Sequence, residues 1–262
     1  MTKSLDSLTV LVSGGAGYIG SHAVLALRDH GIKTIVIDNL TTGFRWAVPE
    51  DVPLIEGDVG DLAWVSSQIQ DHDIGAILHF AGSVVVPESV SNPLKYYENN
   101  TSNSRALIEA AVTSGVRHFI FSSTAATYGI PDQVPVTEDA PKQPINPYGM
   151  SKLMTEHMLA DVAKAHVLAL KALVEAPTEC LTMNCGYGRG FSVTEVLDAV
   201  DRVADVKSNR KFEGRRAGDP DALTADNRRI RARLPWTPAY EDLDTIVTHA
   251  LAWEKELQRR AL

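Results

Sequence analysis

A glycine-rich turn near the N-terminus has the residue types and spacing of a phosphate-binding loop. The run Gly14–Gly20 has glycine at positions 14, 15, 17 and 20, follows an apolar stretch and opens a helical pattern. In such a turn one glycine permits the tight bend, another lets the backbone approach a pyrophosphate, and the last allows close helix–strand packing. The free N–H groups at the start of the helix can then bind the phosphates.

An acidic residue at the expected distance supports a dinucleotide as the ligand. Asp38 ends the second apolar run, about 20 residues beyond the turn, as the fingerprint requires. A carboxylate there accepts hydrogen bonds from both ribose hydroxyls and repels a 2′-phosphate, and Asn39, which follows, offers no positive charge to such a phosphate. The pattern therefore predicts NAD. The alternative, a flexible glycine turn beside a surface aspartate, leaves the strand–turn–helix context unexplained.

A tyrosine and a lysine four residues apart form a candidate acid–base pair. Tyr148 and Lys152 lie in a helical pattern that Pro147 opens, and this spacing places both on one helical face. An ammonium group beside a phenol lowers the pKa of the phenol, which makes the tyrosine a general base for a hydroxyl proton. The alternative is an exposed pair on a solvated helix. The position of Tyr148 and Lys152 downstream of a dinucleotide turn favours a catalytic role for the pair.

Hydroxyl side chains follow the fifth predicted strand, in the run Ser122–Ala125. The carboxyl ends of strands border the ligand crevice of an open α/β sheet, so a hydroxyl there can hold a substrate oxygen near Tyr148. We assign this role to Thr124. Capping of the backbone fits Ser122 and Ser123 equally well.

The elements that position these residues alternate between strand and helix patterns. Five β-branched, apolar runs predict buried strands at 8–13, 34–37, 53–56, 76–80 and 117–122. Amphipathic stretches predict helices at 21–30, 62–71, 94–114 and 148–175. Buried strands that alternate with helices indicate an α/β fold with a doubly wound parallel sheet of the Rossmann type.

The second half of the chain predicts one more strand, at 179–184, and three helices. Ser192 and Glu195 form a capping box at the first of these helices, and the other two cover 225–234 and 242–260. We therefore divide the chain into an NAD-binding Rossmann domain, residues 1–176, which includes the Tyr148 helix, and a reduced C-terminal substrate lobe, residues 177–262, packed on it.

Composition excludes several classes of function. The formal net charge of −8 disfavours nucleic acid as a partner, and no apolar run is long enough to span a bilayer. Residues 1–7 are polar and lack the apolar stretch of a signal peptide. Cys180 and Cys185 have no further ligands at metal-like spacing, so we expect no metal site and two reduced thiols in a cytoplasmic protein.

A series of motifs along nearly the whole chain supports a more specific interpretation. In order they are Ser13–His22, Asp38–Leu40, Gly57–Val59, His79–Gly82, Pro87–Val90, Tyr96–Tyr97, Asn99–Asn100, Phe121–Ala125, Tyr128–Gly129, Pro147–Lys152, Asn184–Gly188, Ser192–Val196, Arg215–Asp219 and Leu234–Trp236. This series resembles the extended short-chain dehydrogenase/reductase family, and within it the epimerases that act on nucleotide sugars.

The resemblance implies a site residue by residue. Its catalytic set is Thr124, Tyr148 and Lys152, and its substrate-binding set is Thr124, Arg216 and Asp219. Its cofactor-binding set is Gly14, Gly17, Tyr18, Ile19, Gly20, Asp38, Asn39, Leu40, Asp58, Val59, Phe80, Ala81, Gly82, Asn99, Tyr148 and Lys152. Val84 departs from the family, where many members carry a lysine near the cofactor phosphates. Arg216 and Asp219 lie in a loop, where the alternative is a solvated ion pair.

The resemblance also implies an activity and partners. It implies interconversion of UDP-glucose and UDP-galactose by epimerisation at C4, through a 4-keto sugar, with tightly bound NAD. The expected partners are a UDP-sugar and a second copy of the chain in a homodimer.

One long segment of the family is missing after the catalytic helix. In the family this segment supplies a sixth strand and much of the UDP-binding lobe. Both flanks here are helical patterns without glycine or proline at their junction, which predicts one fused helix from Tyr148 to about Glu175. The loss leaves open a second function, that of an NAD-binding, catalytically impaired relic or a regulatory binding protein. A 4,6-dehydratase is disfavoured because Ala125 and Ala126 stand where those enzymes place an acid pair.

Overall fold

The computed structural model describes residues 8–171, 180–214, 216 and 218–261, and only the backbone of 163–171 and 261. The chain divides into two compact units. The first consists of residues Met1–Gly129 and Pro144–Cys180, and the second of Ile130–Gln143 and Leu181–Leu262. The segment 130–143, which the sequence analysis assigned to the first domain, thus belongs to the second unit.

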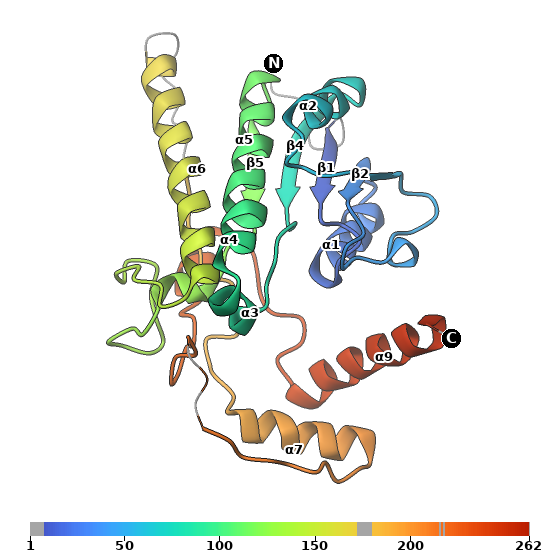
Figure 1. Ribbon diagram of the computed structural model, residues 1–262, viewed down its shortest axis with the longest axis vertical. Coiled ribbons are helices and arrows are strands. Elements are labelled where there is room, and N and C mark those ends of the chain that lie inside the picture. The colour runs from blue at the N-terminus through green and yellow to red at the C-terminus, as the bar shows by residue number, and fades with distance from the viewer. Residues whose placement is uncertain (1–7, 172–179, 215, 217, 262) are drawn as a thin grey trace. The chain divides into compact units, whose positions relative to one another are not determined.

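A parallel sheet forms the centre of the first unit (Figure 1). Its strands follow the order β3-β2-β1-β4-β5, and every neighbouring pair is parallel. Their bounds are β1 Thr9–Ser13, β2 Thr34–Asp38, β3 Leu54–Glu56, β4 Ile74–His79 and β5 His118–Phe121. This order, with the crossover from β3 to β4, is that of a doubly wound nucleotide-binding sheet, so the predicted fold class is confirmed.

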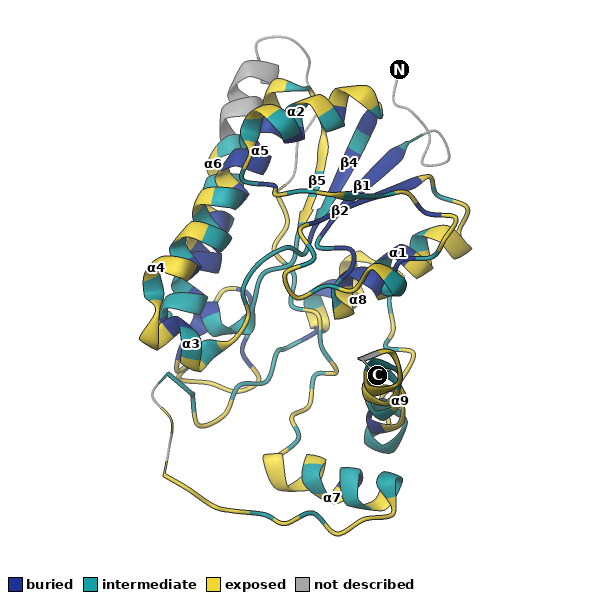
Figure 2. Cartoon of the chain, turned by 45° about the vertical axis from the view of Figure 1, so that its right-hand side comes forward, coloured by how far each residue is buried: buried dark blue, intermediate teal, exposed yellow. Residues whose placement is uncertain are grey.

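Helices cover both faces of the sheet. Successive residues of β1 point to opposite faces, and because they are apolar on both faces, each face is buried by helices. Val10 and Val12 pack with Val24 of α1 (Tyr18–Asp29) in one apolar cluster. Leu11 packs in the other cluster with residues of α2 (Leu62–Asp71) and α5 (Asn103–Thr113). Figure 2 shows the resulting burial along β1 and β4. Continuous apolar runs such as that of β1 are typical of parallel strands buried on both faces.

The helix predicted over 94–114 is present as one continuous helical run, but its hydrogen-bonding pattern changes along its length. The chain there forms α4 (Pro93–Tyr96), a π-helical segment (Tyr97–Ser102) and then α5. Shorter elements around them are α3 (Val86–Ser91) and the 3-10 helices η2 (Arg45–Ala47) and η4 (Ala125–Tyr128). A π-helical turn re-aims side chains within a helix and is often found at functional sites.

The helix of Tyr148 is long and continuous. α6 runs from Pro147 to Lys171, as predicted for that stretch, and the remainder of the predicted fused helix lies outside the described residues. It begins where Asn146 Oδ1 accepts a hydrogen bond from Gly149 N at 2.8 Å. No helix in the described ranges is both long and apolar enough to cross a membrane.

The second unit contains α7 (Val193–Ala204), α8 (Arg228–Arg233) and α9 (Leu243–Ala261). The predicted capping box is present, because Ser192 N donates to Glu195 Oε2 at 2.6 Å and Glu195 N donates to Ser192 Oγ at 3.2 Å. α7 and α9 contact each other.

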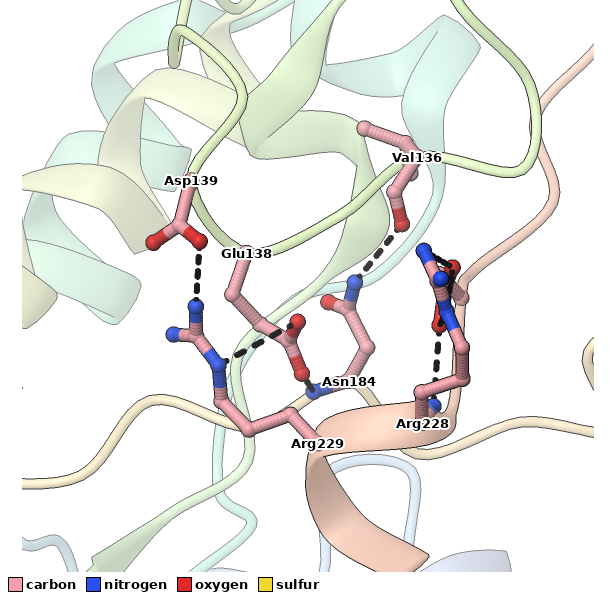
Figure 3. A network of polar contacts seen from close by, with 7 residues as sticks. Val136, Glu138, Asp139, Asn184, Arg228 and Arg229 are labelled. Carbon is pink, nitrogen blue, oxygen red and sulfur yellow. Dashed lines mark hydrogen bonds and ion pairs between the residues drawn. The ribbon is translucent and has the colours of Figure 1, made fainter. Parts of the chain in front are cut away.

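The segment 130–143 is held within this unit by polar contacts. Figure 3 shows the buried carboxylate of Glu138 between Asn184 and Arg229, with distances of 2.8 Å to Asn184 N and 3.5 Å to Arg229 Nε. Asn184 Nδ2 donates to Val136 O, and Asp139 pairs with Arg229.

These contacts explain an error in the sequence analysis. The described part of the strand predicted at 179–184, residues 180–184, is irregular. Asn184 gives its backbone and side-chain N–H groups to residues of 130–143, and Cys180–Thr182 are exposed, whereas a central strand would be buried and paired.

Candidate active site

The glycine turn joins β1 to α1 in the conformation that the fingerprint predicts. Gly14 has φ +73°, a left-handed conformation that favours glycine, and its β-carbon would lie 2.5 Å from Ala81 N. A β-carbon at Gly20 would lie 2.1 Å from Gly14 O. Gly17 differs, because a β-carbon there would make only an ordinary contact, with Gly14 O at 3.4 Å. Gly17 also occupies the N-cap of α1, and exposed Tyr18 and Ile19 follow it.

This geometry fits a dinucleotide. The first N–H groups of an α-helix have no acceptor within the helix, so they can donate to phosphate oxygens at this turn. Because Gly17 has no side chain, a ligand can approach the backbone closely at this position.

Asp38 lies at the carboxyl end of β2, only 8% exposed, where the backbone fixes its carboxylate. Oδ2 accepts from Ala16 N at 2.9 Å, and Oδ1 accepts from Leu40 N at 2.8 Å. Leu40 has φ +55°, so the chain turns sharply after the acid. The carboxylate is thereby held beside the glycine turn, where the ribose is expected.

Further residues of the predicted cofactor-binding set continue this edge of the sheet. Asn39 Nδ2 donates to Asp58 Oδ2 at 3.4 Å. Asp58 is exposed, and its Oδ1 accepts a hydrogen bond from Gly60 N at 2.8 Å, so its carboxylate also caps the local backbone. Val59 is buried in the core.

The segment after β4 returns to the end of β1. Phe80 N and Ala81 N both donate to Ser13 O, at 2.9 and 3.1 Å. Gly82 follows with φ +154°, and its β-carbon would lie 3.4 Å from Lys152 Nζ and 2.9 Å from Asn100 Oδ1. The cofactor segment of β4 therefore lies next to the lysine of the predicted catalytic pair.

Lys152 projects from α6 into the buried centre of this site. It is 3% exposed, its Nζ donates to Ser122 O at 3.2 Å, and it lies 4.8 Å from the centroid of the Phe121 ring. Burial lowers the pKa of Lys152 to about 8, because the charged form loses its hydration.

The segments that carry Tyr148 and Thr124 pack closely against each other through their backbones. Thr124 Oγ1 caps η4 by accepting from Ala126 N at 3.2 Å, and a β-carbon at Gly149 would lie 2.5 Å from Ala126 O. The turn that Thr124 caps thus lies directly on the first turn of α6, which carries Tyr148. A hydroxyl that accepts one hydrogen bond can still donate its proton to a ligand.

A residue to which the sequence analysis gave no role connects these parts. Asn100, in the π-helical segment, is buried; Oδ1 accepts from Ser83 N at 2.7 Å, and Nδ2 donates to Ser83 O at 3.0 Å and Ser151 Oγ at 3.1 Å. Asn99, which was predicted to bind cofactor, donates to Ser83 Oγ at 2.8 Å. The available signal was spacing, since Asn100 stands four residues from Tyr96 and from Ser104 on one buried helical face.

Arg216 and Asp219 lie in the second unit, apart in sequence from all the residues above. Their side chains pair with each other, with Nε–Oδ2 at 2.9 Å, and Arg216 is largely exposed. Val84, in the first unit, is exposed where many family members carry lysine.

Two glycine substitutions should separate folding from ligand binding. Gly20→Ala forces a β-carbon against backbone and should lower the free energy of unfolding by about 2–3 kcal/mol. Gly17→Ala meets only ordinary contact, so stability should change by less than about 0.5 kcal/mol, while the added methyl should weaken NAD binding at least roughly tenfold.

Urea unfolding and calorimetric titration with NAD measure both effects. Gly214→Ala is the control, because nothing lies within 4 Å of its β-carbon. NAD binding by Gly17→Ala as tight as that of the unaltered chain would contradict the assignment of the turn.

Buried Lys152 predicts a pH-dependent stability. Between pH 8 and 10.5 the unfolded chain holds a proton that the folded chain has released, so the free energy of unfolding should rise with pH across this window. Lys152→Met removes this contribution, which is roughly 3 kcal/mol at 1.36 kcal/mol per pKa unit. Its stability relative to the unaltered chain should therefore fall as pH rises from 8 to 10.5.

Urea unfolding at several pH values tests this, with exposed Lys33→Met as the control. Equal pH slopes for the Lys152→Met variant and the unaltered chain would show that Lys152 titrates normally.

Comparisons with known proteins agree with this geometry. The family model of the NAD dependent epimerase/dehydratase family matches residues 10–202. The UDP-glucose 4-epimerase of Azospirillum brasilense is 41% identical, over 98% of this chain and 95% of that protein, and the UDP-glucose 4-epimerase of Lactobacillus helveticus is 33% identical, over 95% and 97%.

Solved structures give the same result. The UDP-Glc/GlcNAc 4-epimerase from Campylobacter jejuni superposes with a TM-score of 0.84 at 33% identity, covering 95% of this chain and 100% of that one. UDP-glucose 4-epimerase from Brucella ovis, in complex with NAD, gives 0.83 at 33% identity, covering 92% and 96%. The enzyme from Bifidobacterium longum, in complex with NAD+ and UDP, gives 0.86 at 26% identity, covering 95% and 98%.

The alignment with the Azospirillum protein runs over 331 positions, 69 more than the 262 residues of this chain. Because it covers 98% of this chain, the missing positions are mostly internal, which confirms the predicted loss of an internal segment. The matched family model, the identities and the dinucleotide fold of the first unit together show that the chain belongs to the NAD-dependent epimerase/dehydratase family.

Proposed function

We propose that the chain is a UDP-glucose 4-epimerase, an isomerase that interconverts UDP-glucose and UDP-galactose with tightly bound NAD. The observation that carries the proposal is the position of Lys152, which contacts Ser122 O at the end of β5 and lies beside Gly82 after β4. It joins the predicted cofactor segment to the predicted catalytic helix within one unit. The names of the relatives, which are UDP-glucose 4-epimerases, support the substrate.

In this proposal, the residues of the first unit hold the cofactor. The turn from Gly14 to Gly20 and the start of α1 hold the pyrophosphate, and Asp38 holds the ribose whose hydroxyls match its fixed carboxylate. When bound, NAD would supply reversible hydride transfer at C4 of the sugar, with no net oxidation, so no external redox partner would be consumed.

The proton of the sugar hydroxyl is moved by side chains of α6 and β5. Tyr148 accepts the 4-hydroxyl proton as the C4 carbonyl forms, and gives it back when the carbonyl is reduced. Lys152 is the second member of the predicted acid–base pair and lies one turn further along α6. Thr124 donates a hydrogen bond to the same sugar oxygen and fixes its orientation. Arg216 and Asp219 bind the nucleotide, at the expense of the ion pair that they form with each other.

Three finer points belong to the proposal. A groove of about 420 Å³ between α5 and α6, lined by apolar side chains such as Ile108, Val112 and Met158, supports a homodimer through these helices. Exposed, unpaired thiols at Cys180 and Cys185 are compatible with a cytoplasmic protein. The assignment of a cofactor-binding role to residues 1–176 and of a substrate-binding role to residues 177–262 remains a prediction, except that the segment 130–143 belongs to the second unit.

Turnover of UDP-galactose tests the function directly. The purified chain should form UDP-glucose without added reductant, and Tyr148→Phe should lower kcat at least roughly 100-fold, because the proton acceptor is lost. Chromatography of the nucleotide sugars measures both rates. Tyr240→Phe, on an exposed tyrosine of the second unit, is the matched control.

The outcomes separate the two functions that the sequence allows. NAD binding without any UDP-glucose formation would contradict the epimerase and support a binding protein. Equal activity of the Tyr148→Phe and Tyr240→Phe variants would contradict the role of Tyr148.

A further inference from the structure

A buried histidine lies beneath the cofactor site, at the end of β4. His79 is 1% exposed, and both ring nitrogens have partners. Nδ1 is 2.6 Å from Ser13 Oγ, at the end of β1, and Nε2 is 2.8 Å from Ser104 Oγ, on α5. Both serines are buried. The ring therefore connects three elements that meet under the glycine turn.

The direction of the hydrogen bonds fixes the state of the ring. Ser104 Oγ lies 2.6 Å from Asn100 O, a carbonyl that can only accept, so the Ser104 hydroxyl donates there. It must then accept from His79 Nε2–H. Burial, with the nearby charge of Lys152, lowers the pKa of His79 to about 3, so the ring is neutral. Its Nδ1 therefore accepts from the hydroxyl of Ser13.

The imidazole ring of His79 is also linked to Lys152 through the ring of Phe121. His79 stacks on Phe121, with ring centroids 5.6 Å apart and planes 29° apart. Lys152 Nζ lies 4.8 Å from the centroid of that Phe121 ring. A neutral imidazole can pack in this position, whereas an imidazolium would repel the nearby ammonium group of Lys152.

His79 is also next to the backbone contacts that close the cofactor site. Ser13, which donates to its Nδ1, accepts through its carbonyl from Phe80 N and Ala81 N. Side-chain and main-chain bonds thus tie the ends of β1 and β4 together. Gly14 follows Ser13, and Phe80 follows His79.

We propose that His79 is a positioning residue that sets the geometry of the NAD site and of Lys152, by joining Ser13, Ser104 and Phe121. The inference rests on NAD binding by the first unit and deepens the proposed function by naming the group that fixes the site. His79 touches neither cofactor nor substrate in this account and acts only through its three partners.

Matched substitutions separate this role from plain core packing. His79→Gln keeps a hydrogen-bond acceptor and a donor that can reach both serines. His79→Phe keeps an aromatic ring but removes the hydrogen-bond partner of both serine hydroxyls. Calorimetric titration with NAD should show binding at least roughly tenfold weaker for His79→Phe, and within about threefold of the unaltered chain for His79→Gln. His118→Gln, on an exposed histidine of β5, is the control.

Single hydroxyl deletions test the network if His79→Phe fails to fold. Ser13→Ala and Ser104→Ala each remove one partner, and each should weaken NAD binding roughly threefold to tenfold. If His79 only filled space, His79→Gln would not restore NAD affinity. Restored affinity in this variant therefore indicates a hydrogen-bonding role.

The contrary results are distinct. If the unaltered chain and the His79 and serine variants bind NAD equally well, or if His79→Gln binds as weakly as His79→Phe, the positioning role is wrong and the proposed function stands. If neither the unaltered chain nor His118→Gln binds NAD, the proposed function fails and this inference fails with it.

Discussion

The close approach of two backbone segments is the constraint on which the first unit depends. The turn after β1 passes so near to the segment after β4 that a β-carbon at Gly14 would lie 2.5 Å from Ala81 N. Hydrogen bonds from Phe80 N and Ala81 N to Ser13 O hold this approach. It exists because β1 and β4 are adjacent parallel strands whose carboxyl ends meet at the switch point of the sheet, where ligands bind in such folds.

The candidate catalytic groups are placed by the same edge of the sheet. β5 pairs with β4 and delivers Ser122 to Lys152, and Asn100 ties the segment after β4 to α6 through Ser83 and Ser151. The candidate cofactor segment and the helix of Tyr148 are therefore joined by hydrogen bonds. These contacts all lie within the first unit, although the chain lacks at least 69 positions of its Azospirillum relative.

Residues whose role depends on local conformation were predictable from sequence. The glycine turn and Asp38 have fixed spacing relative to one strand and one helix, and the strands of the sheet are continuous apolar runs. Contacts between distant segments were not predictable in this way. The burial of His79 between Ser13 and Ser104 depends on tertiary packing, and so does the attachment of 130–143 to the second unit through Glu138 and Arg229. The strand predicted at 179–184 was wrong for residues 180–184, because Asn184 donates hydrogen bonds to Glu138 and Val136 in the segment 130–143.

The central claim is that a chain shortened internally keeps a complete and selective NAD site. The most direct measurement is the nucleotide that purified protein releases on denaturation, identified and counted per chain after saturation with equal concentrations of NAD and NADP. The account predicts one NAD per chain and almost no NADP, because the carboxylate of Asp38 is fixed where a 2′-phosphate would lie. Release of neither nucleotide, or of NADP in equal amount, would contradict it.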